Sequence, residues 1–418
     1  MNSAKRPLEG IKVIEMATYV AGPCCARYMA DLGADVIKVE SPTGDPLRFT
    51  AVSEGRPYGD AEDTSFCMEN SGKRCITLNI KSNEGRAALE KLISEADIFI
   101  TNVRLAPLER AGLDYKTLRA KYPKLVMGLV SGYGEKGPDK DLPGFDFTAF
   151  FARGGIMGTM YDKDSVPMLP VAGFGDHQVG LYLAGGILAA LYRARETGEG
   201  DLVVVSLFHS ALWDVGLYLS CSQYGDPSTQ YPVSRKKIAN QLNVAHRTKD
   251  NFWVQIALPR YDYYYPKFCP VIGREDLIGD PRYFPETNAQ AHLEEFHDIV
   301  AEGIGKLDLA ELERRMKEAD LPYAVCQTWQ QVLEDEQAWG SDALAKVKFP
   351  NGMERTLVRT PIMFTETGLP PYERGRFLGE DTREILSELG YTAGQIDAMF
   401  AAGDAADVKR IGGKDQTS

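Results

Sequence analysis

Short apolar runs alternate with amphipathic segments along the first half of the chain. The runs that predict buried strands lie at 12–16, 35–40, 75–80, 98–101 and 125–132. The segments between them have helical periodicity, and in 83–96 the apolar residues share one face. Strands separated by helices of this length build right-handed βαβ units on a parallel sheet. The pattern therefore predicts an α/β fold.

The pattern changes near residue 222. Before it, 177–195 predicts a long buried helix and 202–208 a buried strand. After it the chain is polar and then aromatic, with helical segments at 290–304 and 308–320. Strand patterns return near 340, where Asn351-Gly352 predicts a hairpin turn, and a last helix is expected at 381–389. We expect two domains, formed by 1–222 with 335–418 and by 223–334.

Composition narrows the class of protein. The 418 residues carry a net charge of −12, which disfavours nucleic-acid binding as the main role. No apolar run is long enough for a membrane span, and no signal peptide precedes the first strand, so we expect a cytoplasmic protein. Seven cysteines without a C-x-x-C pair indicate reduced thiols, and five scattered histidines give no metal motif.

The first strand–helix unit has the outline of a dinucleotide site, with Glu40 where a ribose ligand would be expected. However, the turn "VAGPCC" lacks the G-x-G-x-x-G glycines, and Pro23 stands where a middle glycine would be needed. A proline in the first turn of a helix explains this stretch without a cofactor. We expect no prosthetic group.

Basic and polar residues lie beside two of the predicted strands: Lys73 precedes the strand at 75–80, whereas Asn102, Arg104 and Arg110 follow the strand at 98–101. Loops beyond the carboxyl ends of parallel strands bind ligands in open α/β sheets, and cations there suit a phosphate-bearing ligand. Solvated surface charge explains the same residues equally simply. The candidates are Lys73, Asn102, Arg104 and Arg110.

Asp176, in "AGFGDHQVG" (172–180), begins the long apolar helix directly after two glycines. It can be read as a helix cap or as a carboxylate nucleophile. The positive end of a helix would keep such a carboxylate ionised, and bare glycines would leave its approach open. Asp146, in a loop rich in glycine and proline, is a second candidate carboxylate. His177 fits a packing or capping role better than that of a base.

Five blocks of sequence, in order, resemble the family III CoA-transferases (the CaiB/BaiF family). They begin with "LEGIKVIEMATYVAGPCCARYMADLGADVIKVE" and end with "FLGEDTREILSELGY". Between them lie "NSGKRCITLNIKSNEGR", "GYGEKGPDKDLPGFD" and "GDHQVGLYLAGGILAALYRARETGEGDLVVVSL". The resemblance implies a Rossmann-like large domain with a parallel sheet built from both chain ends, a smaller α+β domain, and a homodimer of interlocked chains.

The resemblance also implies a mechanism. The aspartate at the position of Asp176 attacks an acyl-CoA thioester, and an aspartyl anhydride and an aspartyl-CoA thioester follow. Asp146 matches an acidic residue near the reacting centre. Coenzyme A is then a substrate, and the residues expected at or beside it are Val20, Ala21, Lys73, Asn102, Arg104 and Arg110.

Three features depart from the family pattern. The glycine run that covers the site in some transferases is absent, and "ALPRYDYYYP" (257–266) occupies roughly that region. Asp381 stands where many members have histidine. Phe145 stands where the related acyl-CoA racemases carry a catalytic histidine, which argues against the racemase alternative.

Within the family, the chain is most similar to transferases of amino-acid-fermenting anaerobes. These implied relatives move CoA from an enoyl-CoA, such as cinnamoyl-CoA or 4-methylpent-2-enoyl-CoA, to a 2-hydroxy acid, such as phenyllactate or 2-hydroxyisocaproate. They feed a 2-hydroxyacyl-CoA dehydratase, which is a candidate partner. Tyr261, Tyr263, Tyr264 and Tyr265 suit either an apolar acyl pocket or a protein core. A non-catalytic acyl-CoA-binding partner of the dehydratase is a further alternative.

Overall fold

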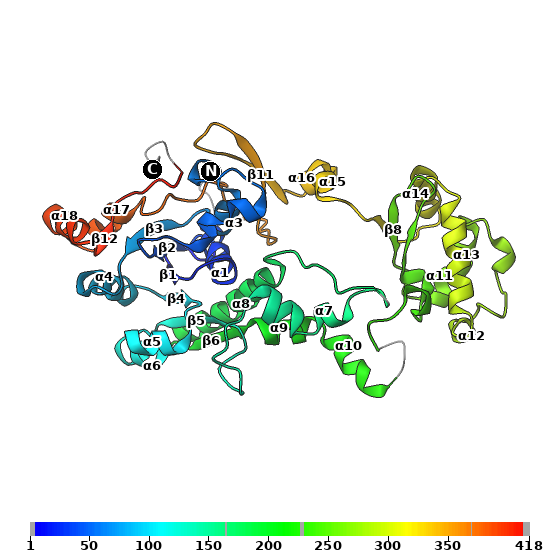
Figure 1. Cartoon of the computed structure of the whole chain (residues 1–418), viewed down its shortest axis with the longest axis horizontal. Helices are drawn as coiled ribbons and strands as arrows, with labels where there is room; N and C mark the ends of the chain where they lie inside the picture. Colours follow the sequence, from blue (N-terminus) through cyan, green and yellow to red (C-terminus); the bar gives the residue numbers. More distant parts are fainter. Residues whose placement is uncertain (1–4, 164, 226–229, 369, 413–418) are drawn as a thin grey trace. The chain divides into compact units, whose positions relative to one another are not determined.

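A computed structural model describes residues 5–163, 165–225, 230–368 and 370–412. The chain divides into two compact units (Figure 1). The large unit comprises Met1–Gly155, Pro170–Asp214 and Asp335–Ser418, and the small unit comprises Ile156–Leu169 and Val215–Glu334. Whether independent folding domains end at 222 and 334 stays a prediction.

The large unit is built on a seven-stranded sheet of order β12-β3-β2-β1-β4-β5-β6. Its strands are β1 Lys12–Met16, β2 Asp35–Glu40, β3 Arg74–Leu78, β4 Ile98–Thr101, β5 Val126–Ser131, β6 Leu202–Ser206 and β12 Ala405–Ala406. The first six strands are parallel, and β12 pairs antiparallel with β3. The predicted α/β sheet drawn from both chain ends is confirmed.

Helices cover both faces of this sheet (Figure 1). On one face they bury an aliphatic core against alternate strand residues such as Ile14 and Ile37. The helices of this face are α4 Asn83–Ser94, α5 Leu105–Ala111, α6 Tyr115–Lys121, α17 Thr382–Glu388 and α18 Ala393–Ala402. On the opposite face lie α1 Ala21–Asp31 and α8 Phe174–Thr197. None of the helices in the described ranges has the length and apolar character needed to cross a membrane.

Glycines let α8 lie unusually close to its neighbours. A Cβ on Gly128 of β5 would stand 2.5 Å from Ile187 of α8. A Cβ on Gly180 of α8 would stand 2.9 Å from both the Ala21 carbonyl oxygen and the Cys24 sulfur of α1. Contacts this short exclude larger side chains, so these two glycines fix the distance of α8 from the sheet and from α1.

Charged side chains, rather than apolar ones, point from β1 and β2 toward α1. The Glu15 carboxylate accepts hydrogen bonds from Lys38 Nζ at 2.8 Å and from Lys73 Nζ at 2.6 Å. Lys38 Nζ also lies 2.9 Å from Asp45 Oδ2 and donates to the Ala17 carbonyl at 2.9 Å. Burial alone would raise the pKa of Glu15, but the two ammonium groups lower it below its usual value. The network anchors the loop that follows β1.

The small unit has an antiparallel sheet of β7 Ala245–Arg247, β8 Trp253–Ile256 and β9 Tyr323–Val325. Its helices are α7 Ile156–Thr159, α10 Gly216–Cys221, α11 Tyr261–Val271, α12 Glu286–Ala289, α13 Leu293–Gly305, α14 Leu309–Glu318 and α15 Trp329–Glu334. Tyr261 and Tyr265 are buried in its core and donate hydrogen bonds to backbone carbonyls, whereas Tyr263 is exposed. Two of the four tyrosines are therefore core residues.

The rest of the large unit shows where sequence patterns held and where they failed. The helices α2 Ala51–Glu54, α3 Thr64–Asn70, α9 Leu207–Asp214 and α16 Glu336–Gly340 complete it, with β10 Leu344–Lys348 and β11 Glu354–Val358. The predicted hairpin at Asn351-Gly352 is confirmed. The strand predicted to 208 is wrong at its end, because α9 starts at Leu207. Helix α18 was not predicted, although Thr392 and Gln395 form a capping box at its start.

Candidate active site

The strand order changes direction between β1 and β4, so the carboxyl ends of these two strands form the switch point of the sheet. From β1 the chain proceeds outward to β2 and β3, whereas from β4 it proceeds the other way to β5 and β6. Ligands of open α/β sheets bind at such a switch point. Asn102, just after β4, bridges it: its Nδ2 donates to the Thr18 carbonyl at 2.8 Å, and its Oδ1 accepts from the Thr18 amide at 3.1 Å.

A hydrogen bond to Asp45 also holds the loop after β1. The Tyr19 backbone has a φ of 63°, in the left-handed region, and its amide donates to Asp45 Oδ1 at 3.0 Å. Val20 and Ala21 follow directly and begin α1, with Ala21 buried and Val20 partly exposed. Asn102, Val20 and Ala21 therefore lie close together near the carboxyl ends of β1 and β4, and their contact with a ligand stays a prediction.

Asp176 lies in the first turn of α8, beside this loop. The helix starts after Gly173, whose φ of 83° suits glycine. A Cβ on Gly173 would be 3.6 Å from Val20, so the start of α8 contacts the β1–α1 loop. The Asp176 side chain is half-buried there.

Asp146, rather than Asp176, occupies the amides at the start of α8. It begins a π-helical segment, Asp146–Ala152, and its Oδ2 accepts a hydrogen bond from the Gly173 amide at 2.8 Å. Its buried Oδ1 has no hydrogen-bond partner within the described residues. A Cβ on Gly175 would stand 2.4 Å from Asp146 Oδ1 and from the Phe150 ring, so Gly175 permits this approach. Asp146 therefore binds the backbone at the start of α8, and the Asp176 carboxylate is not needed as a helix cap.

The charge of Asp146 raises the proton affinity of Asp176. Burial, followed by the charge of Asp146, raises the pKa of Asp176 to about 7, and the nearby His177 lowers it in part. Burial raises the pKa of Asp146 as well, although hydrogen bonding to the backbone amides of Gly173 and its neighbours lowers it in part. The expectation that the helix start keeps Asp176 ionised is therefore wrong, because the helix amides face Asp146 instead.

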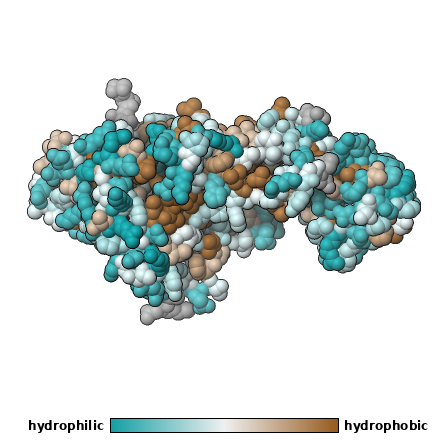
Figure 2. Space-filling model, turned by 90° about the horizontal axis from the view of Figure 1, so that it is seen from below, coloured by the Kyte–Doolittle hydropathy of each residue, from teal (hydrophilic) through white to brown (hydrophobic). Residues whose placement is uncertain are grey.

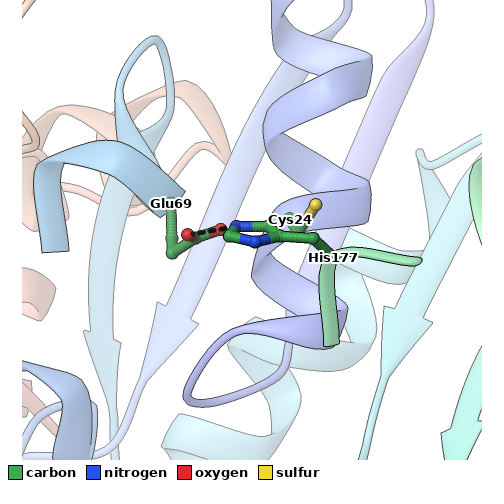
Figure 3. Close-up of side chains that lie close together, drawn as sticks. All are labelled: Cys24, Glu69 and His177. Carbon is green, nitrogen blue, oxygen red and sulfur yellow. Dashed lines mark hydrogen bonds and ion pairs between the residues drawn. The ribbon is translucent and has the colours of Figure 1, made fainter. Parts of the chain in front are cut away.

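His177 points to α3 and pairs with Glu69, as Figure 3 shows. Its Nε2 lies 2.9 Å from Glu69 Oε1, and the Cys24 sulfur of α1 is close by. Burial lowers the pKa of His177, but the hydrogen bond and charge of Glu69 outweigh it, so the net pKa is raised. The prediction of a packing or capping histidine did not foresee this pair. Glu69 carried no signal in the sequence, because its partner is 108 positions away.

Cys24, Glu69 and His177 offer three ligand-type atoms within 4.8 Å of one another. A thiol must lose its proton to bind a metal ion. Burial raises the pKa of the Cys24 thiol well above its usual range, and the negative charge of Glu69 adds to this. The His177 imidazole is already hydrogen-bonded to Glu69. The group is therefore better described as a hydrogen-bonded pair beside a neutral thiol.

The predicted cations separate into two kinds. Arg104 and Arg110 are exposed on α5 and the turn before it, and no ion pair holds either of them within the described part of the chain. Lys73 is 2% exposed, and its Nζ donates to Glu15, to Asn70 Oδ1 at 2.8 Å and to a backbone carbonyl. The structure thus leaves the arginines open to an anionic ligand and uses all three donors of Lys73 internally.

Phe145 and Asp381, which depart from the family pattern, differ in burial and in their contacts. Phe145 is 60% exposed and makes an edge-to-face contact with Tyr19 at 6.3 Å between ring centroids, so the site has no titratable group at this position. Asp381 is buried, and its Oδ2 accepts a hydrogen bond from the Cys75 amide at 2.8 Å. Asp381 therefore joins the start of α17 to β3.

Comparisons with known proteins agree with this fold and identify the family. The family described as CoA-transferase family III matches residues 8–382, and the chain belongs to this family. It is 48% identical to a cinnamoyl-CoA:phenyllactate CoA-transferase of Clostridium sporogenes, over 96% of this chain and 97% of the relative. It is 42% identical to an (R)-2-hydroxy-4-methylpentanoate CoA-transferase of Clostridioides difficile, over 93% and 97%. A CaiB/BaiF family protein of Brucella suis, known from a crystal structure, has a TM-score of 0.79 and 28% identity, covering 92% of this chain and 100% of the other.

Proposed function

We propose that this enzyme transfers CoA from an enoyl-CoA to a 2-hydroxy acid, with Asp176 as the covalent nucleophile. The observation that carries the proposal is the half-buried Asp176 carboxylate in the first turn of α8, beside the β1–α1 loop at the switch point. The substrate class rests on the two clostridial relatives, whose names specify phenyllactate and 2-hydroxy-4-methylpentanoate. An aryl or branched aliphatic 2-hydroxy acid is the expected acceptor.

In the proposed reaction the Asp176 carboxylate attacks the thioester carbonyl, and the C–S bond breaks to give a mixed anhydride and CoA thiolate. The thiolate then attacks the aspartyl carbonyl, so that an aspartyl-CoA thioester forms and the first carboxylate leaves. The acceptor carboxylate repeats these steps in reverse and leaves as the new acyl-CoA. The first attack uses the ionised form of Asp176, which a pKa of about 7 makes available at neutral pH, and in the later steps Asp176 is acylated.

We assign CoA to the switch point, at the carboxyl ends of β1 and β4. Val20, Ala21 and Asn102 would contact it there, and the exposed Arg104 and Arg110 would pair with its phosphates. Lys73 is buried, and it supports the β1–α1 loop through its ion pair with Glu15.

A homodimer forms part of the proposal. Large apolar side chains of the large unit are exposed, among them Tyr192 at 72%, Trp213 at 75% and Phe174 at 55%. Figure 2 shows several apolar areas among polar side chains on one face. Exposed apolar surface of this kind favours a protein partner, for which a second copy of the chain is the simplest choice. Buried thiols such as those of Cys25, Cys67 and Cys75 support a reducing, cytoplasmic setting, and a dehydratase is the proposed consumer of the product.

The test is to trap the covalent intermediate. The protein is incubated with cinnamoyl-CoA or 4-methylpent-2-enoyl-CoA and hydroxylamine, and its peptides are analysed by mass spectrometry. We expect a hydroxamate on the peptide that contains Asp176, and none in Asp176→Asn. The matched control is Asp141→Asn, at an exposed aspartate of the loop before Asp146, which should label like the wild type. Failure to label, with an acyl-CoA that binds, would refute the nucleophile and favour a racemase or a binding protein.

A further inference from the structure

Negative charge accumulates around the proposed nucleophile. Asp146 and Asp176 lie together at the start of α8, and the Glu69 carboxylate faces the next residue of that helix, His177. Lys73 and Arg27 are also cations near Glu69, but the Lys73 ammonium is bound to Glu15 and the Arg27 guanidinium to Asp31. The imidazole of His177 is therefore the group that can balance the carboxylates when the acyl-CoA, itself an anion, enters.

The Glu69–His177 pair is rigidly placed. Glu69 is 5% exposed near the end of α3, and the Arg27 guanidinium of α1 donates to the Met68 carbonyl at 3.1 Å and so holds that end. At the other end of α3, Asp63 accepts a hydrogen bond from the Phe66 amide at 3.0 Å. The His177 side chain is 36% exposed, so one side of its ring faces Glu69 and another remains accessible.

We propose that Glu69 holds His177 as an imidazolium, and that this cation keeps Asp176 ionised for its attack on the thioester. The inference rests on the proposed function, because it gives His177 a positioning role toward the same nucleophile. Nε2 of His177 lies 2.9 Å from Glu69 Oε1 (Figure 3), so it donates to a carboxylate, and His177 directly follows Asp176 in the first turn of α8.

The directions of the titrations support this role. Groups from each neighbouring element act on His177: Glu69 of α3, Asp146 of the π-helical segment and Asp176 of α8 favour its protonated form, while burial opposes it. His177 in turn lowers the pKa of Asp176 against burial and the charge of Asp146. Cys24 of α1 also adjoins the pair, as a neutral thiol. Loss of the imidazolium should therefore raise the pKa of Asp176 further.

The first part of the test measures the protonation of His177 directly and does not depend on enzyme activity. The chain has five histidines, so protein labelled with 13C at histidine Cε1 gives five resonances, and the one lost in His177→Gln is assigned. We expect its midpoint to lie above the usual histidine value in the wild type and to fall in Glu69→Gln. A midpoint at or below the usual value in the wild type would overturn the proposal.

The second part is the pH profile of kcat/KM for the acyl-CoA. In His177→Gln and in Glu69→Gln we expect the acid limb to move up by about one pH unit, which lowers the rate about tenfold at pH 6 and leaves the alkaline plateau in place. The control is His292→Gln, which removes the comparable pair of His292 with Glu295 in the small unit. An unmoved acid limb in two folded variants that still bind CoA would overturn the inference. A wild type that never labels Asp176 would refute the proposed function, while the histidine titration would still test the pair.

Discussion

Replacing Glu15 by glutamine removes the one carboxylate shared by two buried ammonium groups. The side chains of Glu15, Lys38 and Lys73 are all fully buried. Lys38 Nζ lies 2.8 Å from Glu15 Oε1, and Lys73 Nζ lies 2.6 Å from Glu15 Oε2. Lys38 retains Asp45 at 2.9 Å, but Lys73 retains only neutral acceptors, such as Asn70 Oδ1. A buried charge without a partner is strongly destabilising, by about 3–5 kcal/mol in known cases.

The structure also sets an upper limit to this loss. Lys73 can escape by losing its proton, which at pH 7 costs about 4–5 kcal/mol for a lysine whose usual pKa is ~10.4, at about 1.4 kcal/mol per pH unit. At pH 9 the same deprotonation costs only about 2 kcal/mol. In the folded variant the protonated form of Lys73 is disfavoured, so its pKa is lower there than in the unfolded chain. The loss of folding free energy is therefore largest at low pH and becomes smaller as the pH rises toward the pKa of lysine in the unfolded chain. The destabilisation should therefore fall from about 3–5 kcal/mol at pH 7 to about 2 kcal/mol or less at pH 9.

Hydrogen exchange followed by mass spectrometry measures this loss, on peptides that cover β1, β2 and β3. The free energy of opening is compared between Glu15→Gln and the wild type at each pH. Glu95→Gln is the matched control, since it breaks the exposed pair of Lys12 with Glu95, which should be worth about 1 kcal/mol or less. A loss that is equal at pH 7 and pH 9, or no larger than that of the control, would refute the reasoning.

Three further outcomes follow from the site and the core. Gly175→Ala should place a methyl group against the buried Phe150 ring, destabilise the protein by about 1–3 kcal/mol in denaturant titrations and depress hydroxamate labelling. Arg104→Ala and Arg110→Ala should each raise KM for the acyl-CoA several-fold with little change in kcat, because they remove ground-state ion pairs; an unchanged KM in both would place CoA elsewhere. Burial lowers the pKa of His246 to about 3, so the small unit should lose stability as pH falls from about 6.5, at up to about 1.4 kcal/mol per unit, and His246→Gln should flatten this slope in exchange measurements.

Much of the fold could be predicted because its signals are local. Apolar runs separated by helical periodicity predicted the parallel strands and the long helix α8, and Asn351-Gly352 predicted its hairpin. Failures occurred where local signals were short: β12 has two residues and pairs only through the sheet edge, and the apolar run after β6 continues into α9 without a break in hydrophobicity.

The sequence by itself singled out Asp176, because two glycines before a charged helix start are visible in a few residues. Only the tertiary structure decided what surrounds it. Asp146 reaches the α8 amides because Gly175 has no side chain, and His177 meets Glu69 because α3 and α8 both pack against α1. Lys73, which resembled a surface cation, is turned inward to Glu15. Periodicity reports which face of one element is buried, whereas the partner of a charge depends on strand order and on how closely helices approach, and both are set only when the whole chain folds.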